Sequence, residues 1–264
     1  MPKYDLEQIR NYWKSQAVKH KQSPSASWLD TPVIEMEIRA ILDYIEHGDM
    51  VLDAGCANGY STIRFASQKN IHIIGIDYLP EMIEQATESL KQWRDKIQGS
   101  ISFEIGSVMA IKKSNNIYDK VILKRVIASL GEYNNQLKGI RECARVLKPS
   151  GLLLLSDATL QGWEKLNTFR REWQLPEIPI PAFNSYLDRE KVITDLAPEL
   201  ELVETKNFAS TYFVGTRIIK PLLVKALGLN IDSANPNAEW NQWFSKLPAW
   251  GDYGTQELFI FKKK

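Results

Sequence analysis

The sequence has 264 residues, a length that allows one large domain or two small ones. Hydrophobic residues make up 44% of the chain and charged residues 25%, which excludes a disordered or collagen-like protein. Lys and Arg number 33 and Asp and Glu number 32, so the formal net charge is +1 and the sequence carries no basic footprint for nucleic acid.

Cysteine and histidine are too scarce for a disulfide framework or for a metal cage built from these residues. The chain has only two cysteines and three histidines. No stretch approaches the ~18 uninterrupted apolar residues of a membrane span, and the first ten residues lack the apolar core of a signal peptide. We therefore expect a cytoplasmic protein with no metal and with neither a membrane nor nucleic acid as partner. Its oligomeric state stays open.

Two helices are predicted before the first strand. Apolar residues recur weakly at helical spacing over residues 6–20 and more strongly over residues 34–45. Thr31 is a candidate N-cap of the second helix, and Pro32 occupies its first turn. We expect residues 1–47 to form a helical lid.

Between residues 48 and 160, short apolar runs alternate with helical segments. The predicted strands cover residues 50–54, 71–77, 101–105, 120–124 and 152–156, and the predicted helices cover 60–67, 81–98 and 135–147. This alternation is typical of βαβ units and of a parallel sheet covered on both faces. It predicts an α/β, Rossmann-like fold whose cofactor-binding core is residues 48–160.

The remaining residues, 161–264, have a less regular pattern. A proline-rich loop follows a helical segment, and alternating runs at residues 200–208 and 257–262 complete a doubly wound, mostly parallel seven-stranded sheet. Long insertions beside such a core usually build a binding site. We therefore expect the insertions to cap the substrate site within a single domain of residues 1–264.

The strongest local signal is the run Val51-Leu52-Asp53-Ala54-Gly55-Cys56-Ala57-Asn58-Gly59 at the end of the first predicted strand. Gly55 and Gly59 allow a sharp turn from strand to helix and a close approach of the backbone to a ligand. Asp77 ends the next strand, where a carboxylate can accept hydrogen bonds from both hydroxyls of a ribose. The G-x-x-x-G spacing differs from the G-x-G-x-x-G of dinucleotide enzymes, which disfavours NAD. The run and Asp77 together predict an adenosine-type cofactor.

These residues resemble the class I S-adenosylmethionine-dependent methyltransferases, whose first motif runs Asp-x-Gly-x-Gly-x-Gly. The chain matches this motif at Asp53, Gly55 and Gly59 and has Ala57 at the remaining glycine. Ser107 stands where the family commonly has an aspartate that bonds the adenine amine. Further matches lie at residues 75–83, 103–108, 118–130 and 145–151, so the resemblance covers residues 48–160.

The resemblance implies S-adenosyl-L-methionine as the cofactor. It places the cofactor contacts in the loops that follow the first four strands. The implied cofactor-binding residues are Asp53, Gly55, Cys56, Ala57, Asn58, Gly59, Asp77, Tyr78, Met82, Gly106, Ser107, Val108, Lys124 and Arg125.

The residues that act on the methyl acceptor must come from outside this core. His20 is the first candidate general base, because it lies in the segment expected to close as a lid, and Asp157 and Tyr212 come after it. The candidate substrate contacts are polar or aromatic residues of the insertions: Thr159, Asn167, Arg170, Asn184, Arg217 and Tyr253. Five tryptophans are either walls of the lid or packing against the core: Trp13, Trp28, Trp240, Trp243 and Trp250.

The whole chain also resembles uncharacterised bacterial methyltransferases that act on small molecules in glycan or specialised-metabolite clusters. The segments Leu160–Asn167 and Gly251–Gln256 contribute to this resemblance. It implies a small-molecule partner and O-methylation of a sugar or a related hydroxylated or acidic metabolite. Two alternatives stay open: N-methylation of a small amine, and a catalytically inactive cofactor-binding subunit, which Ala57 and Ser107 favour.

Overall fold

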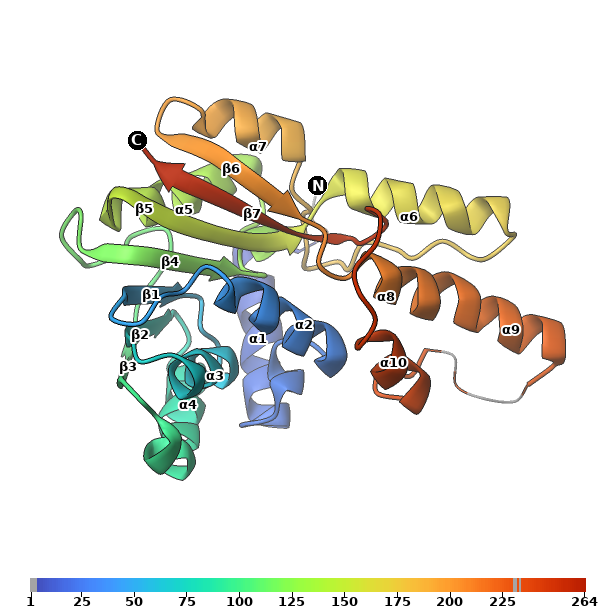
Figure 1. Cartoon of the computed structure of the whole chain (residues 1–264), viewed down its shortest axis with the longest axis horizontal. Coiled ribbons are helices and arrows are strands. Elements are labelled where there is room, and N and C mark those ends of the chain that lie inside the picture. Colours follow the sequence, from blue (N-terminus) through green and yellow to red (C-terminus); the bar gives the residue numbers. More distant parts are fainter. Residues whose placement is uncertain (1–3, 230–231, 233) are drawn as a thin grey trace.

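Seven strands form one sheet in a computed structural model that describes residues 4–229, 232 and 234–264 (Figure 1). The strand order is β3-β2-β1-β4-β5-β7-β6; β7 is antiparallel to both of its neighbours, β5 and β6, and the other adjacent pairs are parallel. The strands are β1 (Met50–Ala54), β2 (His72–Asp77), β3 (Ser100–Ile105), β4 (Tyr118–Lys124), β5 (Leu147–Ala158), β6 (Leu200–Lys206) and β7 (Gln256–Lys263). The predicted doubly wound, mostly parallel sheet is confirmed.

The helices lie between and beside these strands. They are α1 (Leu6–His20), α2 (Thr31–Leu42), α3 (Tyr60–Gln68), α4 (Pro80–Trp93), α5 (Tyr133–Val146), α6 (Leu160–Glu172), α7 (Arg189–Leu196), α8 (Ser210–Val214), α9 (Lys220–Leu227) and α10 (Glu239–Phe244). A π-helix, Gly215–Ile219, joins α8 to α9. In the described part of the chain, no helix is long and apolar enough to cross a membrane.

Alternating side chains of the strands enter two hydrophobic cores, one on each face of the sheet. In β4, Ile122 lies in the core that includes α2 and α3, whereas Val121 and Leu123 lie in the core that includes α5 and α7. This alternation follows from the two-residue period of a strand. Because both faces are buried, the central strands read as the continuous apolar runs from which they were predicted.

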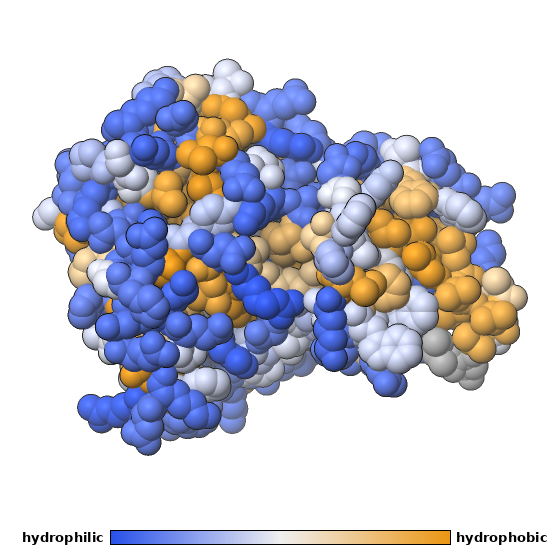
Figure 2. Space-filling view, in the orientation of Figure 1, coloured by the Kyte–Doolittle hydropathy of each residue, from blue (hydrophilic) through white to orange (hydrophobic). Residues whose placement is uncertain are grey.

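The insertions in the second half of the chain form an arm, which consists of α6, α8, the π-helix, α9 and α10. The arm extends to the right of the sheet in Figure 1. Hydrophobic side chains gather on its surface at the right of Figure 2. Leu227, the last residue of α9, is 66% exposed. Trp243 of α10 and Trp250, which lies between α10 and β7, are 61% and 77% exposed. These two tryptophans are therefore surface residues. Neither of the two expected roles, a wall of the lid or packing against the core, describes them.

The strand order also determines where a ligand can bind. The chain passes from β1 outward to β2 and β3 and then returns to add β4 on the other side of β1. In open α/β sheets, ligands bind at the carboxyl ends of the strands beside such a reversal of strand order. The loops after β1, β2, β3 and β4 meet there.

Candidate functional site

A cavity of about 740 Å³ lies at the carboxyl ends of β1 to β4, a size typical of small-molecule and cofactor sites. The helix α1 supplies one of its walls. The lining residues are Leu6, Glu7, Ile9, Arg10, Asn11, Trp13, Ser27, Gly55, Cys56, Ala57, Asn58, Tyr60, Ser61, Asp77, Tyr78, Leu79, Met82, Gly106, Ser107, Val108, Met109, Lys124, Arg125, Val126, Ser129 and Leu130.

The loop between β1 and α3 approaches the cavity with an unusual backbone. Gly55, Ala57 and Gly59 have φ values of 84°, 49° and 74°. A Cβ atom on Gly55 would lie 2.2 Å from Cγ2 of Val126. Glycine is therefore needed here for two reasons: a side chain would clash with Val126, and the positive φ disfavours other residues. Ala57 adopts the left-handed conformation without being glycine, which stores strain at the site.

Asp77, at the end of β2, is the central carboxylate of the cavity. Its Oδ2 accepts a hydrogen bond from the backbone N–H of Ala57 at 3.1 Å, and its Oδ1 accepts one from the N–H of Leu79 at 3.0 Å. Burial raises the pKa of Asp77 to about 6, although these backbone hydrogen bonds oppose the shift. The side chain is therefore fixed in place and ionised at neutral pH.

An apolar wall lies next to Asp77. Leu79, Met82 and Val108 line the cavity and are nearly fully buried. Ser107 also lines it, but its Oγ accepts a hydrogen bond from the backbone N–H of Met109 at 3.2 Å. This part of the cavity suits a flat apolar ring.

The loop after β4 brings two cations to the cavity. Lys124 donates from Nζ to Oγ of Ser61 at 2.7 Å. The fully buried carboxylate of Glu37 lies behind both cations, with Oε2 at 3.9 Å from Lys124 Nζ and 3.3 Å from Arg125 Nη1. Glu37 also accepts a hydrogen bond from the hydroxyl of Ser156. This part of the cavity is therefore lined by two cations, and the buried carboxylate of Glu37 lies close to both of them.

The surroundings of these two side chains disfavour the charged form of Lys124 and leave a donor of Arg125 without a partner among the described residues. Burial, together with the charge of Arg125, lowers the pKa of Lys124 to about 8, although Glu37 and Asp53 oppose the shift. Arg125 has a φ of 56°, and its buried Nε has no hydrogen-bond partner in the described part of the chain. A buried donor without a partner is costly, which points to a ligand at this place.

Most of the predicted cofactor residues line this cavity. The two exceptions are Asp53 and Gly59. Asp53 lies beneath the loop, where it accepts a hydrogen bond from the Thr62 hydroxyl at 2.6 Å and burial raises its pKa. Gly59 is the N-cap of α3, and a Cβ atom there would lie 2.6 Å from the ring of Phe103. Both residues shape the loop from outside the cavity.

The three candidate bases lie elsewhere; the described lining of the cavity includes none of them. His20 is in the last turn of α1. Asp157 is buried and accepts hydrogen bonds from the backbone N–H groups of Ala128 and Ala158. Tyr212 is buried in the arm and donates to Asp30 at 2.6 Å. These placements give Asp157 and Tyr212 structural partners instead of a free path to a ligand.

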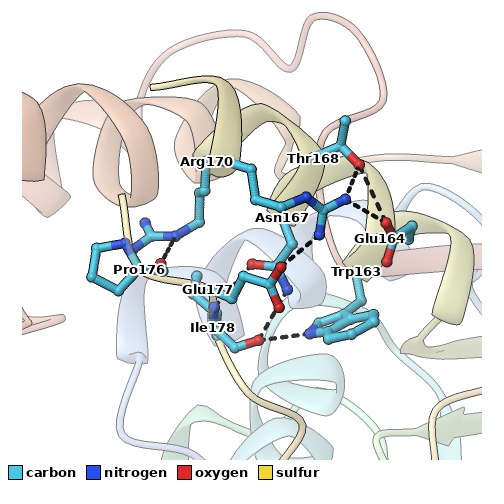
Figure 3. A network of polar contacts seen from close by, with 9 residues as sticks. Trp163, Glu164, Asn167, Thr168, Arg170, Pro176, Glu177 and Ile178 are labelled. Atoms are coloured by element: carbon cyan, nitrogen blue, oxygen red, sulfur yellow. Dashed lines mark hydrogen bonds and ion pairs between the residues drawn. The ribbon is translucent and has the colours of Figure 1, made fainter. Parts of the chain in front are cut away.

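The candidate substrate residues also lie outside the described lining, and the side chains of three of the six bond the backbone. Figure 3 shows Asn167 and Arg170 on α6, reaching to the proline-rich loop. Asn167 exchanges hydrogen bonds with the backbone of Ile178, and Arg170 donates to the carbonyl of Pro176 at 2.7 Å. Their side chains therefore fix the shape of this loop.

Two of the other four candidates have structural partners: Thr159 caps α6, and Arg217 pairs with Asp30. Tyr253 lines a separate surface groove beside α6. Asn184 accepts a hydrogen bond at 3.3 Å from the hydroxyl of Ser129, which does line the cavity.

Sequence reasoning expected a helical lid over residues 1–47 but did not name Leu6 and Ile9 of α1 as residues that line the cavity. Leu6, Ile9 and Trp13 line the cavity and recur at helical spacing, so the periodicity carried a signal. Phe183 of the proline-rich loop stacks on Tyr12 at 4.1 Å between ring centroids and thereby holds the outer side of α1. This contact joins residues about 170 positions apart, which no local pattern reveals.

The cavity fits an S-adenosylmethionine molecule in three respects. The Asp77 carboxylate matches a ribose diol, and the wall of Leu79, Met82 and Val108 matches adenine. The cations Lys124 and Arg125, with the unpartnered Nε of Arg125, match the carboxylate of a methionine moiety.

Comparison with known proteins agrees with this fit. The family model described as "Methyltransferase domain" matches residues 45–190. The chain is 30% identical over 113 residues to 27-O-demethylrifamycin SV methyltransferase of Amycolatopsis mediterranei, covering 43% of this chain and 40% of that protein. It is 26% identical over 136 residues to O-methyltransferase rstn1 of Aspergillus nomiae, covering 50% of this chain and 58% of that protein. The chain thus spans about half the length of these curated relatives.

Solved structures share the fold. The crystal structure of geranyl diphosphate C-methyltransferase from Streptomyces coelicolor, a complex with S-adenosyl-L-homocysteine, superposes with a TM-score of 0.54 at 11% identity. The match covers 87% of this chain and 78% of that one. The family model covers more than half of the chain, and the cavity has the loops that the family uses. The chain therefore belongs to the methyltransferase domain family, and its cofactor is S-adenosylmethionine.

Proposed function

We propose that this protein is an O-methyltransferase that acts on an acidic oxygen of a small metabolite. S-adenosylmethionine supplies an electrophilic methyl group in such reactions. The residues of the chain then have three tasks: to hold the two reactants in line, to exclude water, and to favour the ionised form of the acceptor.

The observation that carries this proposal is that the described lining of the cavity offers no free general base. It contains no histidine, and its cations Lys124 and Arg125 match the carboxylate of the cofactor's methionine moiety. Of the two lining carboxylates, Asp77 is engaged by backbone N–H groups, and Glu7 is an exposed residue in the first turn of α1.

The lack of an evident base discriminates between acceptors. A neutral sugar hydroxyl must lose its proton to a base in the transition state. A carboxylate is already ionised at neutral pH, and a phenol has a pKa of only about 10. A lining without a free base therefore favours an acidic oxygen over the neutral sugar that is the other acceptor class expected from the sequence.

Apolar side chains support a compact acceptor with a hydrophobic body. Leu6 and Ile9 of α1 line the cavity, as do Val126 and Leu130 of the segment after β4. Such surfaces, with a few polar groups that fix orientation, are typical of small-molecule sites. A relative named as an O-methyltransferase, rstn1, supports oxygen as the acceptor atom.

Transfer of a labelled methyl group to a panel of acceptors tests the proposal. The panel contains aromatic carboxylic acids, phenols, neutral sugars and small amines. We expect labelled products only from the acids and phenols, and about 10- to 100-fold less product at subsaturating cofactor with the Asp77→Asn variant, which serves as the control for cofactor-dependent transfer. Products confined to sugars or amines would contradict the proposal. Cofactor binding without any product would instead favour the cofactor-binding subunit.

A further inference from the structure

Asn58 lies in the β1–α3 loop, but its side-chain donors do not bond that loop. The chain segment that joins α1 to α2, residues 21–28, is called the strap below. Asn58 donates from Nδ2 to the carbonyl oxygens of Lys21 and Ser23, both at 2.7 Å. Asn58 is only 1% exposed, so the donor end of both bonds is shielded from water.

A second cofactor loop holds the other end of the strap. Arg125, after β4, donates to the hydroxyl of Ser27 at 3.3 Å. Its guanidinium also lies over the ring of Trp28, 5.5 Å from the centroid, which is a cation–π contact. The strap is therefore attached at both ends to loops that line the cavity.

Hydrophobic packing joins the same parts. Ala17 of α1 and Ala26 of the strap are fully buried in one small cluster with residues of the apolar wall and the β1–α3 loop. The members of this cluster are Ala17, Ala26, Leu79 and Met82, with Trp13 and Ala57 packed against it. The position of α1 over the cavity is thus linked to the parts of the protein that contact the cofactor.

We propose that Asn58 is a positioning residue that couples the β1–α3 loop to α1, so that α1 closes over the cavity when the cofactor is bound. The loop is strained at Ala57, whose φ is 49°, and a bound ligand selects this conformation. In this conformation the side-chain amide of Asn58 donates hydrogen bonds to both strap carbonyls. The sequence predicted Asn58 as a cofactor contact, and this role is different. The proposal rests on cofactor binding alone and is independent of the acceptor.

Amide hydrogen exchange of the full chain, with and without S-adenosylhomocysteine, tests this coupling. In the wild type we expect the ligand to slow exchange over residues 6–28 by at least about tenfold, the size expected for two buried hydrogen bonds. In Asn58→Ala we expect exchange over these residues to stay fast at saturating ligand. We also expect the ligand to dissociate about tenfold faster.

The matched control is Gln92→Ala. Gln92 donates to the side chain of Gln22 at 3.0 Å, so this change removes a contact with the strap that does not involve a cofactor loop. The control should keep the ligand-induced protection. A merely structural role of Asn58 would lower the stability of the protein but leave that protection intact.

Three results would overturn the proposal. The first is full protection of residues 6–28 by ligand in Asn58→Ala. The second is no protection in the wild type. The third is complete loss of ligand binding in Asn58→Ala, which would make Asn58 a cofactor contact. If Asn58→Ala does not fold, Asn58→Ser, which is too short to reach both carbonyls, takes its place with the same expected outcomes.

Discussion

At the scale of single residues, two shifted pKa values bracket the pH range in which the cofactor should bind. Burial raises the pKa of Asp77 to about 6, and ribose hydroxyls donate to the ionised carboxylate. Binding below pH 6 must therefore first remove a proton, so affinity falls as the pH drops. Burial lowers the pKa of Lys124 to about 8, so above that pH the ammonium loses its charge and its attraction for a carboxylate.

The prediction is a maximum in the affinity for S-adenosylhomocysteine between pH 6 and pH 8. Calorimetric titration from pH 5 to pH 9 measures it, and each limb should approach a tenfold loss per pH unit. Lys124→Met should remove the alkaline limb and keep the acidic one. A flat profile in the wild type would contradict the assignment of both residues.

The buried Glu37 carboxylate provides a second prediction at this scale. Glu37→Gln keeps the shape of the side chain but leaves Lys124 and Arg125 without their counter-charge, and breaking a buried ion pair costs about 3–5 kcal/mol. Denaturant unfolding measures the loss. The control is Glu88→Gln, which breaks an exposed pair with Lys91 and should cost about 0.5 kcal/mol or less. Equal effects of the two changes would show that the buried cluster is not coupled by charge.

At the scale of elements, the turn from β1 into α3 depends on Gly55. Gly55→Ala adds about 1–2 kcal/mol of backbone strain and about 1–3 kcal/mol for the displacement of Val126. Gly48 also has a positive φ, but no atom lies within 4 Å of an added Cβ, so Gly48→Ala should cost only the strain. The difference in unfolding free energy between the two variants measures the cost of placing a Cβ atom at residue 55 against Val126. No difference would mean that Val126 moves away without cost.

The elements of the core could be predicted because their signals are local. A strand buried on both faces is a short apolar run, and the loop after β1 carries its glycines at a defined spacing. The contacts of α1 could not be predicted in the same way. They depend on the hydrogen bond from Asn58 to the strap and on the stacking of Phe183 on Tyr12. Both contacts join distant parts of the sequence.

The candidate site was predicted unevenly for a related reason. Residues of the strand-end loops line the cavity because the topology of the sheet brings these loops together. His20, Asp157 and Tyr212 were selected for their chemistry alone, and chemistry does not determine position. As catalytic residues they stay predictions without a place in the described lining of the cavity.

At the scale of the whole molecule, one buried polar group anchors the arm to the rest of the protein. Asp30 caps α2, accepts a hydrogen bond from Tyr212 of the arm, and pairs with Arg217 of the π-helix. Asn241 of α10 donates to the same Tyr212 hydroxyl at 2.9 Å. The arm therefore contacts the chain at the start of α2, close in sequence to Trp28 of the strap.

Tyr212→Phe should lower the unfolding free energy by about 1–3 kcal/mol, because it leaves Asp30 and Asn241 with one fewer partner each in a buried place. Thermal or denaturant unfolding measures this loss. Tyr44→Phe is the control, since its hydroxyl bonds Glu204 at the surface and its loss should change stability by about 0.5 kcal/mol or less. A change at Tyr212 no larger than that at Tyr44 would contradict an anchoring role.

The central claim is that the cavity between α1 and the strand ends holds S-adenosylmethionine through Asp77. Calorimetric titration of the wild type and of Asp77→Asn with S-adenosylhomocysteine at pH 7 tests it most directly. We predict one binding site per chain in the wild type, and affinity lower by about 10- to 100-fold in the variant, because a charged acceptor of the ribose hydroxyls is lost. No binding to the wild type, or equal affinity of the two proteins, would contradict the claim.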